Sequence, residues 1–94
     1  MLFVAKEWQG SSGYWYCSHT DSFPKDVDMW VVPARILGIS ADAFIKLLIE
    51  KFQPDEVFHN EDCSFVSWRW KSQAKMRLYK NWINAEARKK NFQV

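Results

Sequence analysis

The sequence predicts a small α+β fold: a single domain over residues 1–94 with an N-terminal β-hairpin, a helix pair, a second hairpin and a long C-terminal basic amphipathic helix. Two patterns predict it. Runs rich in aromatic and β-branched residues occur in pairs around short polar turns, as in hairpins. Elsewhere apolar residues recur every three or four positions, as on the buried face of a helix. Six Trp, three Tyr and seven Phe supply large rings for one core.

The first hairpin is predicted from the segments "LFVAKEW" and "YWYCSHT", which flank the glycine-containing loop "QGSSG". A phosphate-binding loop would need a helix next, because the helix N-terminus supplies the amide donors, and a strand-like segment follows instead. Residues 20–29, "TDSFPKDVDM", are polar around a proline and are expected to form a loop.

A helix pair is predicted next. Pro33 suits the first turn of a short helix over 33–38, because its missing N–H has no helical partner there. Gly38 ends this helix, and Ser40 is a natural N-cap for a second helix over 41–52. The apolar residues of the second helix recur at helical spacing: Ala41, Phe44, Ile45, Leu48, Ile49 and Phe52.

A second hairpin is predicted from "EVFH" and "CSFVSWRW", on either side of the polar "NED". Side chains alternate between the two faces of a strand, so Val66, Trp68 and Trp70 share a face and are expected in the core. Ser72 is expected to cap the final helix, over 72–90. The apolar arc of that helix is expected to consist of Ala74, Leu78, Tyr79, Trp82, Ile83 and Ala85.

The helix pair has a characteristic spacing, carried by Ala34, Gly38, Phe44 and Leu47. A small alanine permits close approach of the two helices, a glycine permits the tight turn, and the later apolar residues lock the crossing. In these positions the segment over 33–52 resembles the helix-turn-helix family, and a helix pair followed by a hairpin is also the order of elements in winged-helix domains. The resemblance implies a closely packed helix pair and, in DNA-binding members, a second helix that reads bases.

The outward face of the second helix is nevertheless a poor reader of bases. Asp42 repels phosphate and Ile45 offers no hydrogen bond to a base edge, which leaves Lys46 as the strong donor. We therefore expect the helix pair to be a scaffold, with base reading and a protein-binding groove as the alternatives. The expected outward residues are Ser40, Ala41, Asp42, Ile45 and Lys46.

Charge is distributed unevenly along the chain. Residues 1–65 carry five basic and ten acidic side chains, a net charge of −5, whereas residues 66–94 carry eight basic side chains and one acidic, Glu86, a net charge of +7. The C-terminal part is expected to bind an acidic partner, unless the acidic part of the same chain or of a second copy neutralises it.

The final helix carries most of the candidate binding residues. Several of its donors fall on the side opposite Leu78 and Trp82, at a spacing that suits several phosphates. Arg69 and Lys71, at the end of the second hairpin, would extend this surface. A solvated helix face is the alternative, and Lys89 and Lys90 also suit a helix C-terminus because they balance its dipole. The candidate binding residues are Arg69, Lys71, Arg77, Lys80, Asn81, Asn84 and Arg88, with Gln73 on the same side.

Cysteine and histidine occur as two close pairs, Cys17 with His19 and His59 with Cys63. Two thiolates and two imidazoles are a ligand set for tetrahedral zinc. However, the first pair is more tightly spaced than usual and no sequence pattern brings the pairs together, so no metal or other cofactor is predicted. A disulfide between the two cysteines is disfavoured in the cytosol. A cysteine nucleophile would need an orienting third group and an oxyanion site, which no motif indicates, so we expect no enzyme.

The sequence thus predicts a non-enzymatic binding protein of the cytoplasm. No uncharged stretch approaches the roughly 20 residues of a membrane span, and the apolar start has no basic leader and is interrupted by Lys6 and Glu7. The first hypothesis is that the final helix contacts nucleic-acid phosphates. The alternative is a protein-interaction module that binds an acidic protein surface, such as an inhibitor or adaptor encoded by a phage or other mobile element. Self-association of two copies is a third possibility.

Overall fold

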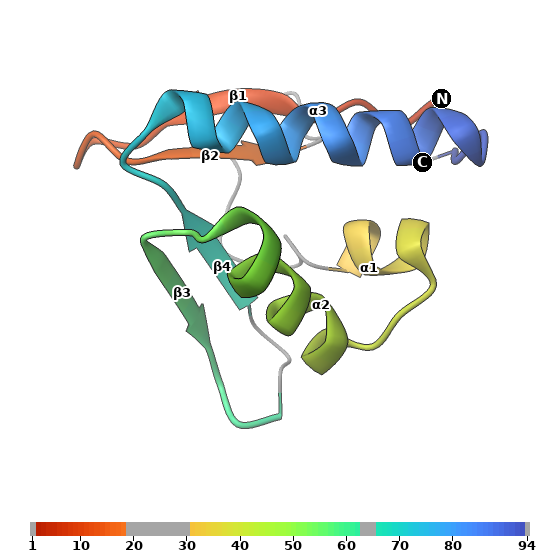
Figure 1. The fold of residues 1–94 in the computed structure, drawn as a ribbon, viewed down its shortest axis with the longest axis horizontal. Helices are drawn as coiled ribbons and strands as arrows, with labels where there is room; N and C mark the ends of the chain where they lie inside the picture. Colours follow the sequence, from red (N-terminus) through yellow and green to blue (C-terminus); the bar gives the residue numbers. More distant parts are fainter. Residues whose placement is uncertain (1, 19–30, 63–65, 94) are drawn as a thin grey trace.

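A computed structural model describes residues 2–18, 31–62 and 66–93, and in these ranges the fold is α+β, as predicted. Figure 1 shows α3 lying along the β1–β2 hairpin, with α1, α2 and the β3–β4 hairpin below them. The loop predicted over residues 20–29 lies outside the described ranges. No helix within them has the length and apolar composition needed to cross a membrane. In chain order the elements are β1 (Lys6–Gln9), β2 (Trp15–Ser18), α1 (Val31–Leu37), α2 (Ala41–Leu47), the π-helical turn η1 (Leu48–Phe52), β3 (Glu56–His59), β4 (Val66–Arg69) and α3 (Gln73–Lys89).

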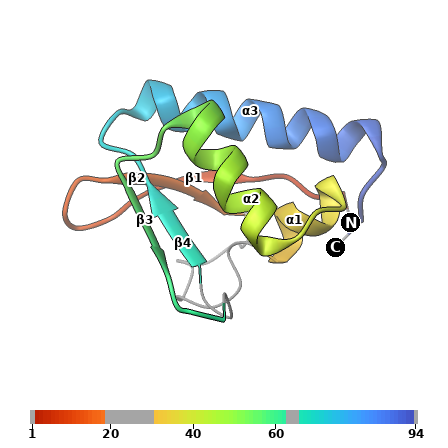
Figure 2. The same ribbon diagram turned by 60° about the horizontal axis from the view of Figure 1, so that its bottom comes forward.

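Both predicted hairpins are confirmed, and a backbone bridge joins them. β1 pairs antiparallel with β2, and β3 pairs antiparallel with β4. The N–H of Trp15 donates to the carbonyl of Trp70 at 2.6 Å, and the N–H of Trp70 donates back to the carbonyl of Trp15 at 2.8 Å. Figure 2 shows β4 running up to β2 at this end. The bridge fixes the position of the second hairpin relative to the first.

The helix pair forms with the local chemistry that the sequence predicts. Helix α1 begins at Val31, which leaves Pro33 in its first turn. Gly38 adopts φ 68°, the left-handed conformation typical of a residue just after a helix, and the N–H of Ile39 donates to the carbonyl of Ala34 at 3.1 Å. The hydroxyl of Ser40 accepts a hydrogen bond from the N–H of Ala43 at 3.3 Å. The predicted glycine stop and serine N-cap are therefore confirmed.

The second helix ends in a π-helical turn, which the apolar spacing does not predict. From Leu48 the chain continues as η1, and Gln53 ends it at φ 48° with its N–H donating to the carbonyl of Leu48 at 3.0 Å. The indole Nε1 of Trp70 donates to the carbonyl of Phe52 at 2.9 Å. This bond satisfies one of the carbonyls that the end of a helix leaves without a helical partner.

The outward face of α2 differs from the predicted one at Ile45. This side chain is only 9 % exposed and packs in the core together with Phe44 and Leu48, whereas Asp42 and Lys46 are exposed. The expectation that Ile45 faces outward is wrong, because α2 and η1 bury a broad apolar arc rather than a narrow stripe.

The core is centred on Tyr79, in the middle of α3. Its ring centroid lies 5.4 Å from that of Phe52, 6.0 Å from that of Trp68 and 5.5 Å from that of Trp70. The first two pairs are edge-to-face. Such a pair stabilises the fold by roughly 0.5–1.5 kcal/mol in addition to the contribution of the apolar area that it buries. Val66, Trp68 and Trp70 are at most 2 % exposed, which confirms the predicted buried face of β4.

Helix α3 has the predicted bounds and N-cap, but the face that it buries differs from the predicted face. The hydroxyl of Ser72 accepts from the N–H of Lys75 at 3.2 Å, as expected of an N-cap. The buried residues include Tyr79 and Ile83, as predicted, but also Met76 and Ala87. Leu78, Ala74 and Ala85, which the apolar arc places in the core, are exposed, Leu78 by 64 %. That part of the prediction is wrong, because a polar stripe of α3 docks on the first hairpin.

The two ends of the described chain lie side by side. The N–H of Phe3 donates to the carbonyl of Phe92 at 3.0 Å, and Leu2 and Gln93 form an isolated β-bridge. Figure 1 shows the N- and C-terminal ends together beside the last turn of α3. The N-terminal segment is thus held by the residues that follow α3.

Candidate binding surfaces

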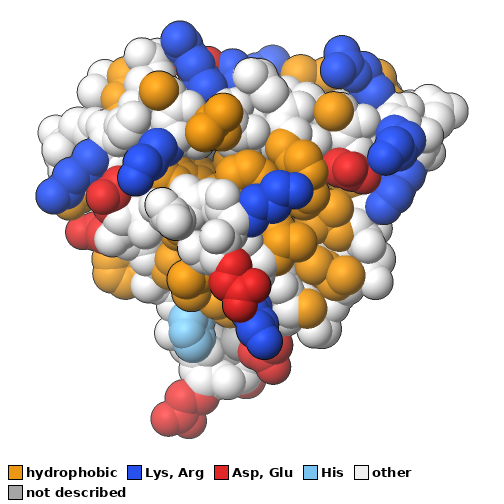
Figure 3. All heavy atoms as spheres, in the orientation of Figure 1, with side chains coloured by type: hydrophobic (Ala, Val, Ile, Leu, Met, Phe, Trp, Pro, Cys, Tyr) orange, Lys and Arg blue, Asp and Glu red, His pale blue; other side chains and the backbone are white. Residues whose placement is uncertain are grey.

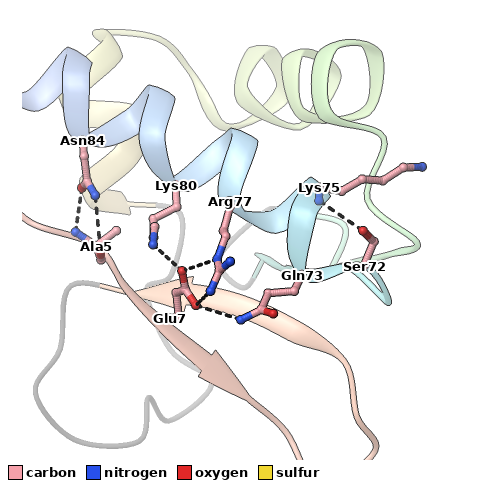
Figure 4. Close-up of polar contacts among 8 residues, drawn as sticks. All are labelled: Ala5, Glu7, Ser72, Gln73, Lys75, Arg77, Lys80 and Asn84. Atoms are coloured by element: carbon pink, nitrogen blue, oxygen red, sulfur yellow. Dashed lines mark hydrogen bonds and ion pairs between the residues drawn. The ribbon is translucent and has the colours of Figure 1, made fainter.

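Glu7, on β1, binds three donors of α3 (Figure 4). Its carboxylate accepts from Arg77 Nε at 2.8 Å and Nη2 at 3.3 Å, from Gln73 Nε2 at 3.2 Å, and from Lys80 Nζ. Residues three and four apart on a helix are neighbours, so one carboxylate reaches all three side chains. The acidic part of the chain therefore pairs with two cations that the sequence offers for an external partner, and the three charged side chains together keep a net charge of +1.

The same contacts shift the acid–base equilibrium of Glu7. Hydrogen bonds first from Arg77 and then from Lys80 lower the pKa of Glu7 from 4.5 to about 2, although partial burial opposes the shift. The contact correspondingly raises the pKa of Arg77. Glu7 is thus charged at any pH above about 3, and the ion pairs persist throughout the physiological range.

Asn84 extends this contact by one helical turn. Its Oδ1 accepts from the N–H of Ala5 at 2.7 Å, and its Nδ2 donates to the carbonyl of Ala5 at 3.3 Å. An amide that pairs with a backbone in both directions holds the chain as a neighbouring strand would. We call the four α3 residues that dock on the first hairpin the seam: Gln73, Arg77, Lys80 and Asn84.

The seam changes the interpretation of the predicted phosphate-contacting face. Three candidate binding residues, Arg77, Lys80 and Asn84, lie in it and hold the protein's own hairpin. Asn81 and Arg88 are exposed, each four positions after a seam residue, and no hydrogen bond to the first hairpin involves them among the described contacts. The structure therefore does not bring the predicted donors of α3 together as one free surface.

Arg69 and Lys71 lie together at another place, beside the ring of Tyr14. The guanidinium of Arg69 lies 5.4 Å from that ring centroid, and the ammonium of Lys71 lies 6.0 Å from it. Arg69 also pairs with Glu56 at 2.8 Å, and the backbone N–H of Lys71 donates to Asp55 Oδ2 at 2.7 Å. The ion pair with Glu56 reduces the attraction of Arg69 for phosphate.

A further surface joins α2 and η1 to α3. A hollow of about 550 Å³ is lined by residues of α2 and η1, and the ammonium of Lys51 at its edge lies 4.7 Å from the ring centroid of Trp82. Leu78 lies one helical turn before Trp82. Figure 3 shows hydrophobic side chains gathered across the middle of this face, below α3, with Lys and Arg side chains among and around them. We call the following residues the apolar strip: Ala43, Leu47, Leu78 and Trp82.

Basic residues outnumber acidic ones around the apolar strip. Lys46 and Glu50 line the hollow beside Lys51. On the α3 side, Figure 4 shows Lys75 pointing away from Glu7, to the opposite side of the helix. Lys89 is 74 % exposed and lies 3.9 Å from Glu86. Asp42 is exposed one helical turn before Lys46. Four lysines thus lie among three acidic residues, a net charge of +1: Lys46, Lys51, Lys75 and Lys89 against Asp42, Glu50 and Glu86.

The apolar strip is not predicted from the sequence, although the sequence contains a signal for it. The apolar arc predicted for the final helix runs from Ala74 to Ile83 over about half of the helix circumference at 100° per residue. A helix that lies on one core buries only part of so wide an arc, and a second surface is needed for the remainder. Leu78 and Trp82 are the part of this arc that the core does not fully bury, so the excess width of the arc is the signal for a second apolar surface.

The zinc ligand set considered in the sequence lies only partly within the described residues. Within residues 2–18, 31–62 and 66–93, no group of three or more His, Cys, Asp or Glu side chains is placed to hold a metal ion. His19 and Cys63 lie outside the described ranges. His59 is exposed, with its Nδ1 3.2 Å from the carbonyl of Asn60. The proposed ligand set thus stays untested, and Cys17 is its buried member.

Cys17 is expected to be a protected thiol. It is 5 % exposed, and burial raises its pKa to about 12. Because only the thiolate is nucleophilic, its alkylation by iodoacetamide at pH 7.5 should be slower in the native protein by a factor on the order of a thousand than in 8 M urea. Mass spectrometry of the digested protein separates the Cys17 peptide from the Cys63 peptide. Equal rates at Cys17 in both solvents would contradict the burial.

Comparison of this chain with protein-family models, with curated proteins and with solved structures found no match.

Proposed function

We propose that this chain is a non-enzymatic binding domain that holds a partner protein on the apolar strip. The observation that carries the proposal is the exposure of Leu78 beside half-buried Trp82 and Leu47, next to a hollow that the described chain leaves open. Contiguous apolar surface on a small domain is typical of interaction sites, whereas single exposed apolar residues are common everywhere. Trp is also among the side chains that contribute most to protein interfaces.

Two features favour a protein partner over nucleic acid. The cations best placed for phosphate, Arg77 and Lys80, are paired with Glu7. Three other exposed cations, Lys46, Lys51 and Lys75, lie around an apolar surface, which phosphate oxygens would not bind. Nucleic-acid binding through α3 is the less well supported of the two hypotheses, since it would have to rely on residues such as Arg88 and Lys71 or on release of the seam.

Leu78→Glu tests the proposal. The substitution places a charge in the apolar strip, and because Leu78 is 64 % exposed on a helix and glutamate is a good helix former, the fold should be unaffected. From a nuclease-treated lysate, a protein that copurifies with the wild type should be lost with Leu78→Glu. Circular dichroism confirms that both chains are folded.

Ile49→Glu is the matched control. Ile49 is 51 % exposed on η1 and, unlike Leu78, does not belong to the apolar strip, so the same replacement of an exposed apolar side chain by glutamate should leave the partner bound. Loss of the partner with both variants, or retention with both, would contradict the assignment to the apolar strip. Copurification that nuclease abolishes, or binding to an oligonucleotide that Leu78→Glu does not weaken, would favour nucleic acid instead.

A further inference from the structure

On the basis of the function proposed above, we propose that the partner presents an amphipathic α-helix with acidic residues beside its apolar face. The inference combines three properties of the apolar strip: the elements that border it, its length and the charge around it.

Helices border the strip on both sides. Ala43 and Leu47 lie on α2, Leu78 and Trp82 lie on α3, and Lys51, at the edge of the hollow, lies on η1. The backbone groups of a helix interior bond within the helix, so this surface offers no row of free N–H and C=O groups to which an extended peptide could add as a strand. Side chains of two neighbouring helices instead form ridges and grooves, into which the side chains of a third helix fit.

The length of the strip suits two turns of a bound helix. The hollow runs from Ala43 to Lys51, nine residues or eight steps along α2 and η1, which is about 12 Å at the α-helical rise of 1.5 Å per step. On α3 the strip spans one further turn, from Leu78 to Trp82. A helix that binds in this way inserts apolar side chains at positions i, i+3 or i+4, and i+7, which span about the same distance.

The charge around the strip selects an acidic helix over a basic one and over a second copy of this chain. Four lysines, Lys46, Lys51, Lys75 and Lys89, lie around it, against the three acidic residues Asp42, Glu50 and Glu86. Acidic residues that flank the apolar positions of the partner would face these lysines, and such complementarity mainly raises specificity and the rate of association. In a two-fold dimer the same surface, with its net positive charge, would face a second copy of itself. The partner is therefore a different chain with acidic flanks.

Selection from displayed helical peptides tests the inference with the purified full chain. Three libraries carry Leu, Ile, Phe, Met or Trp at positions i, i+3, i+4 and i+7, with the flanking positions occupied by Glu, by Lys or by Gln. We expect at least tenfold greater enrichment from the Glu library than from the Lys library. The selected peptides should bind Ile49→Glu as they bind the wild type, and should lose at least tenfold in affinity for Leu78→Glu.

Charge variants of the chain separate the acidic preference from simple apolar contact. Lys46→Glu and Lys75→Glu should each weaken the binding of a selected acidic peptide about five- to tenfold at low salt. Arg35→Glu, the same change of charge on α1, should leave the affinity unchanged. Equal enrichment from all three libraries, no enrichment from any, or peptides that still bind Leu78→Glu would overturn the inference.

The two proposals can fail separately. If a lysate protein is lost with Leu78→Glu but no acidic helix is selected, the strip binds a protein and the helix inference is wrong. If neither occurs, both are wrong. Salt-sensitive dimerisation of the purified chain in sedimentation, abolished by Leu78→Glu, would identify a second copy as the occupant and would likewise overturn the inference.

Discussion

Trp70→Ala is expected to remove most of the free energy of unfolding of the protein at 25 °C. The side chain is completely buried, lies 5.5 Å from the ring of Tyr79 and donates from its indole to the carbonyl of Phe52. Truncating a buried Trp typically costs about 3–5 kcal/mol through lost burial and the cavity left behind. The unpaired carbonyl at the end of η1 adds about 1–3 kcal/mol. Whole domains are stable by only about 5–15 kcal/mol.

Urea unfolding followed by far-UV circular dichroism measures this effect. Leu78→Ala is the control, because it also removes a large apolar side chain but one that is 64 % exposed, and it should change the free energy of unfolding by no more than about 0.5 kcal/mol. Trp70→Phe should fall between the two, because it keeps most of the ring volume and loses the hydrogen bond. A loss below about 1 kcal/mol for Trp70→Ala would show that this ring is not central to the core.

Glu7→Gln is expected to destabilise the protein by about 2 kcal/mol at pH 7 and by little at pH 2. A carboxylate that accepts hydrogen bonds from charged donors contributes about 1.5–3 kcal/mol for each, less where the partner is as exposed as Arg77. The folded-state pKa of Glu7, about 2, lies below its ordinary value of 4.5. The stabilisation is therefore present in full above pH 4.5 and is lost as the pH falls towards 2.

The measurement compares urea midpoints of wild type and Glu7→Gln at pH 7, 4, 3 and 2. The difference between the two should be constant down to about pH 4.5 and should then shrink. Glu56→Gln is the control, because it breaks the single half-exposed ion pair with Arg69 and should cost no more than about 1 kcal/mol. A difference for Glu7→Gln that does not change with pH would mean that its cost arises from something other than the charge.

The elements of the fold are predictable because their signals are local. The φ of Gly38, the caps by Ser40 and Ser72, and the alternation of Val66, Trp68 and Trp70 each depend on residues a few positions apart. The π-helical form of η1 is not predictable in this way, because the hydrogen bond to the carbonyl of Phe52 comes from Trp70, 18 positions later.

The candidate site is predictable only in part, since it depends on how distant elements dock. The charge pattern of the final helix suggests a surface for an acidic partner and leaves open that the acidic half of the chain occupies it. Nothing in the sequence near Arg77 points to Glu7, 70 positions away. Once Glu7 holds Arg77 and Lys80, α3 is turned so that Leu78 faces outward. One tertiary contact thus determines both which cations of α3 are already paired and which of its apolar side chains are exposed.

The contacts of the N-terminal segment also determine when the protein can finish folding. Ala5 is bound by Asn84, 79 positions away, and Phe3 by Phe92. The β1–β2 hairpin has its own turn, but its docking requires a loop to close over nearly the whole described chain, an entropic cost that slows folding. On a ribosome, which makes the N-terminus first, Phe3 and Ala5 stay without their partners until α3 has left the exit tunnel. Completion of the core is therefore expected to follow the emergence of α3.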